Sequence, residues 1–394
     1  MRYNLTDEQE KLVQDAVDFY YNSSEQVFQY AGGAGTGKSV VMNAIVDRLG
    51  LATHEIAPMA YIGAAAIVMR MKGLENARTI HSWILEPKVI VDYDNMDTYM
   101  NRPRKRLIFV PKDLGDKKLI LIDEAGAVPY NLKRDIERHG VKIIACGDLN
   151  QLPPVADKPA YLYSGKVHYL TQIMRQAEGN AIVYFAKRLL QGLPMEPGIY
   201  GNVLCIEDDK LNNSMLSNAQ VIICGRNATR EKFNKYIREQ IVGFHGQLPN
   251  HGERMICRKN NWQVDADGIN LANGLIGTVS NFPNVSNFDG KSYQIDFVPD
   301  LFNSVFRNLT CDYEYFKADT KERERLKKLP YGDNGEKFEL AYAVTTHISQ
   351  GAQYRQGIYF EEYMNRNINN NLNYTGITRF CDWCIYVVPS RKYY

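Results

Sequence analysis

Apolar and polar positions alternate in the first 155 residues in a way that predicts short buried strands separated by helices. Apolar residues recur with helical spacing over 7–21 and 38–50. Residues 26–31 are typical of a strand, and short, continuous apolar runs, typical of strands buried in a parallel sheet, occupy 119–123 and 141–147. This order predicts an α/β domain over residues 1–155, with helices on both faces of its sheet.

Residues 84–118 interrupt this pattern. They have no clear helical period and are interpreted as an inserted arm or hairpin. The second half of this stretch, 101–118, carries seven basic residues against two acidic ones, a local charge of +5 in a chain whose net charge is +2. A basic surface for a nucleic acid would therefore have to be local.

A second α/β pattern covers 156–245 and returns over 336–394. Between these two parts, residues 246–335 contain short strands with Gly and Asn turns, which predicts a small all-β module inserted into the second domain. The charged run 321–328 inside it is interpreted as a solvated linker.

Composition is that of an ordinary globular protein, since 45% of the 394 residues are apolar and 23% are charged. The N-terminal residues do not have the pattern of a signal peptide. No apolar run comes close to the length of about 20 residues that is needed to span a bilayer. Seven scattered cysteines fit a reduced, cytoplasmic protein, either bacterial or encoded by a phage. Cys381 and Cys384 form a lone CxxC, which is interpreted as the entry to a buried strand.

The stretch "GGAGTGKS" (32–39) fits the phosphate-loop pattern G-x-x-x-x-G-K-[ST], between a predicted strand and a predicted helix. Backbone N–H groups of such a loop converge on phosphate oxygens, and the helix N-terminus favours negative charge. Lys38 would reach the outer phosphates and Ser39 would ligate Mg²⁺. The candidate ATP-binding residues are Gly33, Ala34, Gly35, Thr36, Gly37, Lys38 and Ser39.

Two further stretches carry polar groups at strand ends. "LILIDEAG" (119–126) offers Asp123 as a Mg²⁺ ligand and Glu124 to orient the attacking water. "GDLNQLPPV" (147–155) ends a strand in a rigid turn that holds Gln151 in one place. Only one phosphate loop occurs, so an arginine of the second domain would complete the site, and Arg175 and Arg379 are the candidates.

Together these motifs resemble superfamily 1B helicases, the RecD-like branch that includes the Dda-like phage helicases. The resemblance runs from Gln9 to Arg379, with the motifs in the family's order. It rests on "LTDEQEKLV", "GGAGTGKS", "IAPMAYIGAAAIVM", "ARTIHSWI", "LIDEAG", "GDLNQLPPV", "LTQIMRQ", "AYAVTTHISQGAQY" and "YTGITR". Ile348 and Gln353 depart from the family's fifth motif, which commonly has a basic and an acidic residue there.

The resemblance implies two RecA-like domains with ATP and Mg²⁺ between them. It implies that 84–118 is a pin, called 1B, and that 246–335 is an SH3-like barrel, called 2B. Gln151, Arg175, Arg379 and the backbone of Gly351 would contact the γ-phosphate. Gln9 would read the adenine edge, although Thr6 and Gln9 also fit a helix capping box, so both roles stay open.

For DNA, the resemblance implies contacts with a single strand by Pro58, Thr79, His81, Thr346 and Ser349. Tyr93 and Tyr99 would cap the pin, and Arg102 to Arg106 would hold phosphates, although both sets also fit an exposed loop without a role.

The expected function is a monomeric, ATP-driven motor that moves 5′→3′ on single-stranded DNA and unwinds forked duplex DNA. Two alternatives stay open: a RecD-type motor subunit of a nuclease or recombination complex, and a translocase that displaces proteins without unwinding. Single-strand-binding, replication or recombination proteins are the expected partners.

Overall fold

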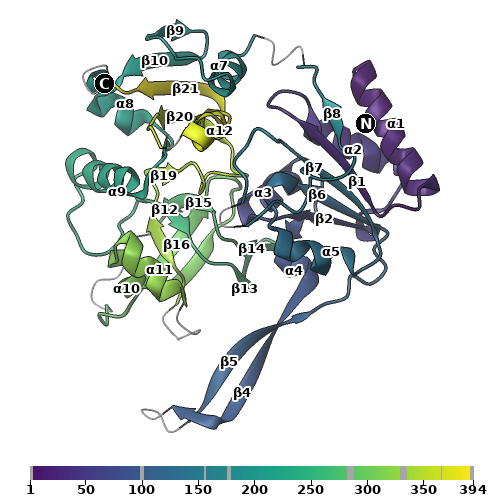
Figure 1. The fold of residues 1–394 in the computed structure, drawn as a ribbon. Coiled ribbons are helices and arrows are strands. Elements are labelled where there is room, and N and C mark those ends of the chain that lie inside the picture. The colour runs from purple at the N-terminus through teal and green to yellow at the C-terminus, as the bar shows by residue number, and fades with distance from the viewer. Residues whose placement is uncertain are drawn as a thin grey trace.

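Two sheets of mainly parallel strands, a projecting hairpin and an antiparallel module make up the fold (Figure 1). The computed structural model describes residues 3–97, 102–154, 157–174, 179–281, 288–328, 335–364 and 366–390. The expected α/β class, with two phosphate-loop-type sheets and an antiparallel module, is confirmed.

The first sheet has the strand order β3-β2-β6-β7-β1-β8, with every neighbouring pair parallel. Its strands are β1 (Val27–Gly32), β2 (Ile56–Ala60), β3 (Arg78–Thr79), β6 (Leu119–Asp123), β7 (Lys142–Gly147) and β8 (His168–Leu170). The helices around it are α1 (Asp7–Asn22), α2 (Lys38–Leu49), α3 (Gly63–Met71), α4 (Ile80–Ile84) and α5 (Lys133–Glu137). Strand β8 extends this sheet beyond residue 155, the expected end of the domain. Because the strands are parallel, β1, β6 and β7 bring the loops that follow them to one edge.

The interrupted region forms a long antiparallel hairpin, β4 (Leu85–Asp97) and β5 (Arg102–Pro111). Figure 1 shows this hairpin reaching away from the rest of the molecule. Tyr99 lies outside the described residues, as do the side chains of Tyr93 and of 102–106.

The second sheet has the order β19-β11-β20-β21-β10-β9, and only β9 runs antiparallel to its neighbour. Its strands are β9 (Gly198–Tyr200), β10 (Val203–Glu207), β11 (Ile222–Cys224), β19 (Ala343–Thr345), β20 (Tyr354–Phe360) and β21 (Phe380–Val388). Its helices are α7 (Ala181–Leu190), α8 (Asn213–Asn218), α9 (Asn227–Tyr236), which continues as η5 (Ile237–Ile241), and α12 (Arg366–Ile377). The CxxC lies at the start of β21, where Cys384 is a buried free thiol, as expected.

The inserted module is a five-stranded antiparallel sheet of order β17-β16-β15-β12-β18 with a small β13–β14 ribbon. It contains β12 (Arg254–Cys257), β13 (Asn261–Ala266), β14 (Ile269–Leu271), β15 (Ile276–Val279), β16 (Ser292–Pro299), β17 (Phe306–Asp312), α10 (Tyr313–Lys317), α11 (Thr320–Lys328) and β18 (Phe338–Leu340). Strand β18 therefore extends the module beyond the expected boundary at 335.

Residues 321–328 form most of helix α11 and are not a linker, although Lys321, Glu324 and Arg325 are exposed, as expected of a solvated face. One of its arginines, Arg323, lies 3.5 Å from the buried Glu339 carboxylate of β18. Arg258 of the module and Arg230 of α9 also pair with Glu339, so this carboxylate joins the module to the second sheet.

The module also contacts the first sheet's helix α3. Ile67 packs in the module's apolar core, and a Cβ at Gly63 would lie 2.5 Å from the Ala272 Cβ. Arg70 Nη1 donates to the Gly268 carbonyl at 2.9 Å. Within the described part of the chain, no helix has the length and apolarity that crossing a membrane requires.

Candidate ATP site and nucleic-acid interface

The phosphate loop lies between β1 and α2, as the sequence predicts. Gly35 and Gly37 have φ values of +81° and +82°, which allow the tight turn into the helix N-terminus. Lys38 Nζ donates to the carbonyls of Gly32 (2.8 Å) and Gly33 (3.2 Å), so its ammonium lies over the loop. The loop and the start of α2 can therefore receive the phosphates of a nucleotide.

Gln9 links helix α1 to this loop. Its backbone N–H and its side-chain oxygen form the capping box with Thr6, and its side-chain amide donates to the Thr36 carbonyl at 2.9 Å. The same amide lies 3.0 Å from Met174 Sδ, and Gln9 is buried. The capping box is thus present together with a direct contact to the phosphate loop, and adenine recognition by Gln9 stays a prediction.

Asp123 ends β6 at the same edge of the sheet. Its carboxylate accepts hydrogen bonds from Glu124 N–H (2.8 Å) and from the Cys146 thiol (3.3 Å). Burial, together with the nearby charge of Glu124, raises the pKa of Asp123 above its usual value. A cation beside this carboxylate would offset both effects.

Three of the predicted residues meet between the two sheets. Arg379 Nη1 lies 3.6 Å from Glu124 Oε1. When the Gln151 amide is oriented to satisfy its neighbours, its NH₂ donates to Glu124 Oε2 at 3.3 Å. In that orientation its carbonyl accepts from Arg379 Nη2 at 3.1 Å. Gln151 therefore joins an acid of the first sheet to an arginine of the second.

The turn that carries Gln151 forms hydrogen bonds with residues of the second sheet's domain. Leu152 N–H donates to Thr375 Oγ1 (3.0 Å), and the Leu152 carbonyl accepts from the Gln350 amide (2.8 Å). The Asn150 carbonyl accepts from Asn371 at 2.8 Å. These hydrogen bonds hold the turn in place, because α12 and the turn after β19 pack against it.

Tyr374 is a site residue that the sequence reasoning missed. Its hydroxyl accepts from Ala34 N–H at 2.9 Å and donates to the buried Asp148 carboxylate. Burial and the charge of Asp148 raise its pKa above the usual range. The signal lay in "YTGITR", from which only Arg379 was chosen.

A cavity of about 570 Å³ lies where these groups meet. Gly351 lines it with a φ of +73°, and a Cβ there would lie 2.6 Å from Ala65 Cβ of α3. Arg175 lies outside the described residues. The cavity lining includes the loop residues Gly33, Ala34, Gly35, Gly37, Lys38 and Ser39, together with Asp123, Glu124, Gln151, Gly351 and Arg379.

The donor set at this cavity fits Mg²⁺. The Ser39 hydroxyl and the Asp123 carboxylate are oxygen donors, and both residues line the cavity. Among the residues that the structure describes, no group of three His, Cys, Asp or Glu forms a metal site on its own. A nucleotide-bound Mg²⁺ takes one or two protein ligands and shares the phosphates, so Ser39 and Asp123 would suffice to hold it.

The predicted DNA contacts are only partly supported by the geometry. Thr346 and Ser349 are fully buried, and their hydroxyls donate to the carbonyls of Cys224 (3.3 Å) and Thr346 (2.9 Å). They hold the turn after β19, and their contact with DNA stays a prediction. Pro58 lies inside β2, and its carbonyl accepts from Trp83 Nε1 at 2.8 Å, so it does not offer a surface either.

Thr79 and His81 lie at the start of α4. The Thr79 hydroxyl caps this helix at Ser82 N–H, and the Thr79 side chain is buried. The half-buried His81 ring lies 6.1 Å from the Tyr61 ring, centroid to centroid, and burial lowers the pKa of His81. Of the five predicted DNA-contacting residues, four are buried and only His81 is partly exposed. Tyr61, whose ring lies beside His81, was not among the predicted residues.

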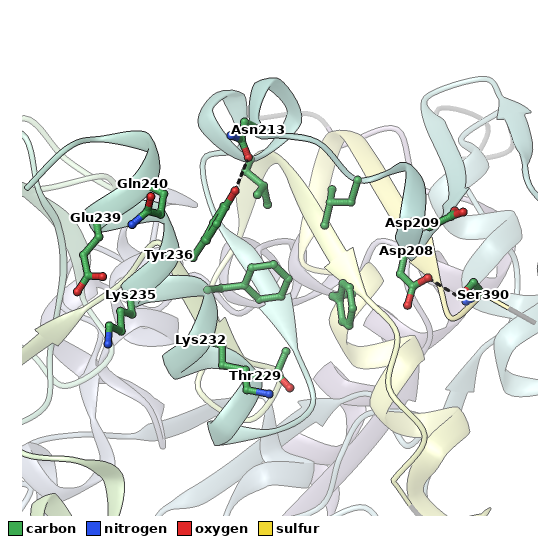
Figure 2. Close-up of a pocket in the computed structure, with 14 residues that line it drawn as sticks. Asp208, Asp209, Asn213, Thr229, Lys232, Lys235, Tyr236, Glu239, Gln240 and Ser390 are labelled. Carbon is green, nitrogen blue, oxygen red and sulfur yellow. Dashed lines mark hydrogen bonds between the residues drawn. The ribbon is translucent and has the colours of Figure 1, made fainter. Parts of the chain in front are cut away.

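A larger cavity of about 940 Å³ lies on the second sheet's domain, beside α8, α9 and η5 (Figure 2). Tyr236 donates to Asn213 Oδ1 within it (2.9 Å), and Asp208 accepts from Ser390 N–H (3.1 Å) at another part of its wall. None of the residues that line this larger cavity also lines the phosphate-loop cavity. The larger cavity is therefore separate from the candidate ATP site, although its volume is greater.

Comparison with known proteins agrees with this geometry. Residues 4–197 match the family model described as "AAA domain". The ATP-dependent DNA helicase RRM3 of Saccharomyces cerevisiae is 31% identical over 172 residues, which is 39% of this chain and 21% of that protein. The ATP-dependent DNA helicase Pif1 of a Psychrobacter species is 29% identical over 175 residues, 38% of this chain and 25% of that protein. The matched parts are thus a quarter or less of the length of these relatives.

Solved structures match nearly the whole chain. A crystal structure of Pif1 helicase from Candida albicans has a TM-score of 0.55 at 16% identity and covers 99% of this chain and 95% of that one. Pif1 from Bacteroides bound to single-stranded DNA has a TM-score of 0.57 at 16% identity, with the same coverage. Residues 4–197 are therefore similar to an AAA domain, and the whole chain shares the overall fold of these solved Pif1 structures.

Proposed function

We propose that the protein is an ATP-dependent DNA helicase that moves 5′→3′ on single-stranded DNA and opens forked duplexes. One observation carries the proposal: Gln151 contacts Glu124 of the first sheet and Arg379 of the second beside the phosphate loop. A nucleotide bound there contacts both halves of the molecule. Its binding and hydrolysis therefore change which relative arrangement of the two halves is favoured.

In this proposal, the phosphate loop and Lys38 bind the ATP phosphates, and Ser39 and Asp123 hold Mg²⁺. The metal supplies positive charge that stabilises the transferred phosphoryl group. Glu124 orients the attacking water, and Arg379 stabilises the charge that develops on the γ-phosphate. Gln151 positions both side chains, and Gly351 lets the second sheet's turn approach α3 closely. Arg175 is proposed as a second arginine from its motif alone.

The nucleic-acid side is proposed from shape and from the relatives' names. The β4–β5 hairpin projects from the first domain and is proposed as the pin that separates strands (Figure 1). His81 and Tyr61 offer rings that can stack on bases at the start of α4. Support also comes from the curated relatives, both of which are named as DNA helicases. A monomer in the cytoplasm, acting with replication or recombination proteins, completes the proposal.

The test is strand separation on two matched duplexes, one with a 5′ single-stranded tail and one with a 3′ tail, in ATP and Mg²⁺. We expect only the 5′-tailed duplex to open, and Lys38→Ala to open neither while keeping the melting temperature of the wild type. Opening of the 3′-tailed duplex alone would refute the polarity. DNA-stimulated hydrolysis without opening of either duplex would favour a translocase or a subunit that requires its complex.

A further inference from the structure

Lys72 is a second lysine at the ATP site, and it lies outside the sequence motifs quoted above. It follows helix α3 as the C-cap residue, where its N–H donates to the carbonyls of Val68 and Met69. Its own carbonyl accepts from Asn43 Nδ2 of α2 at 2.6 Å. The base of this side chain is therefore fixed between the helix of the phosphate loop and helix α3.

The Lys72 ammonium reaches the residue assigned to the metal. Its Nζ donates to Ser39 Oγ at 3.2 Å, and Lys72 lines the same cavity as Ser39, Asp123 and Glu124. Among the described residues, Lys72 forms no ion pair within 4.0 Å, although its charge acts on the Asp123 carboxylate and partly offsets the rise in the pKa of Asp123. Lys38 differs, because its ammonium donates to loop carbonyls at the phosphate side.

We propose that Lys72 competes with Mg²⁺ for Ser39 Oγ and thereby weakens the dependence of nucleotide binding on magnesium. The proposal rests on the proposed ATP site. A hydroxyl oxygen that accepts from an ammonium cannot also coordinate Mg²⁺ at close range without placing two cations next to each other, and their repulsion in a partly buried cleft is strong. Magnesium must therefore displace the ammonium. Without magnesium, the same ammonium adds a positive charge beside the phosphates.

Both effects change one measurable ratio, the Kd of a nucleotide in EDTA divided by its Kd in saturating Mg²⁺. The probe is a fluorescent ADP analogue titrated with the protein of residues 1–394, so the readout does not depend on ATP turnover. In Lys72→Met, binding in EDTA loses a positive charge, and binding in Mg²⁺ no longer displaces an ammonium. We expect the ratio to rise at least about threefold above the wild-type ratio.

Two variants serve as controls. Lys72→Arg keeps the positive charge and should keep a ratio close to that of the wild type. Lys187→Met removes an exposed lysine on α7 that is not among the residues lining the cavity, and it should leave both Kd values unchanged. If Lys72→Met does not fold, as judged by its melting curve, Lys72→Gln replaces it.

The outcomes separate the inference from the proposed function. A purely structural role for Lys72 would change both Kd values by the same factor, and an unchanged ratio would overturn the competition. If the wild-type protein binds the analogue neither in Mg²⁺ nor in EDTA, the ATP site itself is wrong and the inference falls with it. A ratio that rises in Lys72→Met and stays in Lys72→Arg supports the competition.

Discussion

The Tyr374 hydroxyl of α12 donates to the Asp148 carboxylate after β7 and accepts from the N–H of Ala34 in the phosphate loop. One side chain of the second sheet's domain therefore touches two motifs of the first. Asp148 and Tyr374 are both buried, so neither group can replace the lost bond with bulk water.

Tyr374→Phe should lower the free energy of unfolding by roughly 1–3 kcal/mol, because it leaves Asp148 and Ala34 N–H without this partner. The measurement is the apparent melting temperature and the urea midpoint. Tyr236→Phe is the matched control, since it removes a hydroxyl whose bond to Asn213 is exposed. Equal effects of the two substitutions would contradict the assigned role of Tyr374.

Gln151→Leu should reduce the DNA-stimulated rate of ATP hydrolysis roughly tenfold to a hundredfold, because Glu124 and Arg379 lose the amide that positions them. Nucleotide affinity should change little, since Gln151 is not part of the phosphate loop. Steady-state hydrolysis and equilibrium binding of ADP give the two values. Gln14→Leu changes an exposed glutamine of α1 and is the control. A loss confined to nucleotide affinity would argue against this positioning role.

Gly351→Ala should raise the KM for ATP and lower the hydrolysis rate, because its Cβ would meet Ala65 Cβ at 2.6 Å and push the two halves of the cleft apart. Gly243→Ala is a close control. Gly243 has a similar φ of +79°, but its Cβ would meet no atom within 4 Å. Both substitutions strain the backbone by about 1 kcal/mol, so only the steric effect at Gly351 differs. Similar kinetics in the two variants would refute the close approach.

The stability of the module's junction should depend on pH through Glu339. Burial alone would raise the pKa of this carboxyl, but the charges of Arg258, Arg323 and Arg230 outweigh burial and lower the pKa to about 2. The usual value is 4.5, so the stabilisation is fully present above pH ~4.5. It is lost as the pH falls toward about 2.

Unfolding of the wild type and of Glu339→Gln, compared between pH 7 and pH 3, tests this dependence. The difference between the two should be on the order of 3 kcal/mol at pH 7 and should shrink as the pH falls. A difference that stays constant over this range would show that the charge of Glu339 is not the cause.

Shortening the β4–β5 hairpin tests the proposed pin. Lys88 and Ile108 face each other in the ladder, so a two-residue turn can join the strands at that point. We expect the shortened protein to keep DNA-stimulated ATP hydrolysis and to lose strand separation, because the hairpin projects away from the rest of the molecule (Figure 1). Parallel loss of both activities would contradict a separating role.

Much of the nucleotide site was determined by the sequence alone. The phosphate loop, the acids at the end of β6 and the turn with Gln151 lie at strand ends, because continuous apolar runs must be buried and the polar residues that follow them emerge at the sheet edge. The two sheets and the antiparallel module follow from the same periodicity. The resemblance to superfamily 1B helicases rested on the order of the motifs, and the similar proteins include Pif1 helicases.

Only the tertiary structure decided which of these side chains meet. Gln151 and Arg379 are far apart along the chain, and nothing in their local sequence says that Arg379 would reach Glu124. Thr346 and Ser349 looked available for DNA, yet their hydroxyls are used inside a turn, because a buried polar group takes the nearest acceptor. Tyr374 gains its partners across the cleft, and Lys72 gains Ser39 and Asn43 from the packing of α3 against α2. Periodicity describes the face that a residue presents, whereas the contact it makes depends on how separate elements pack.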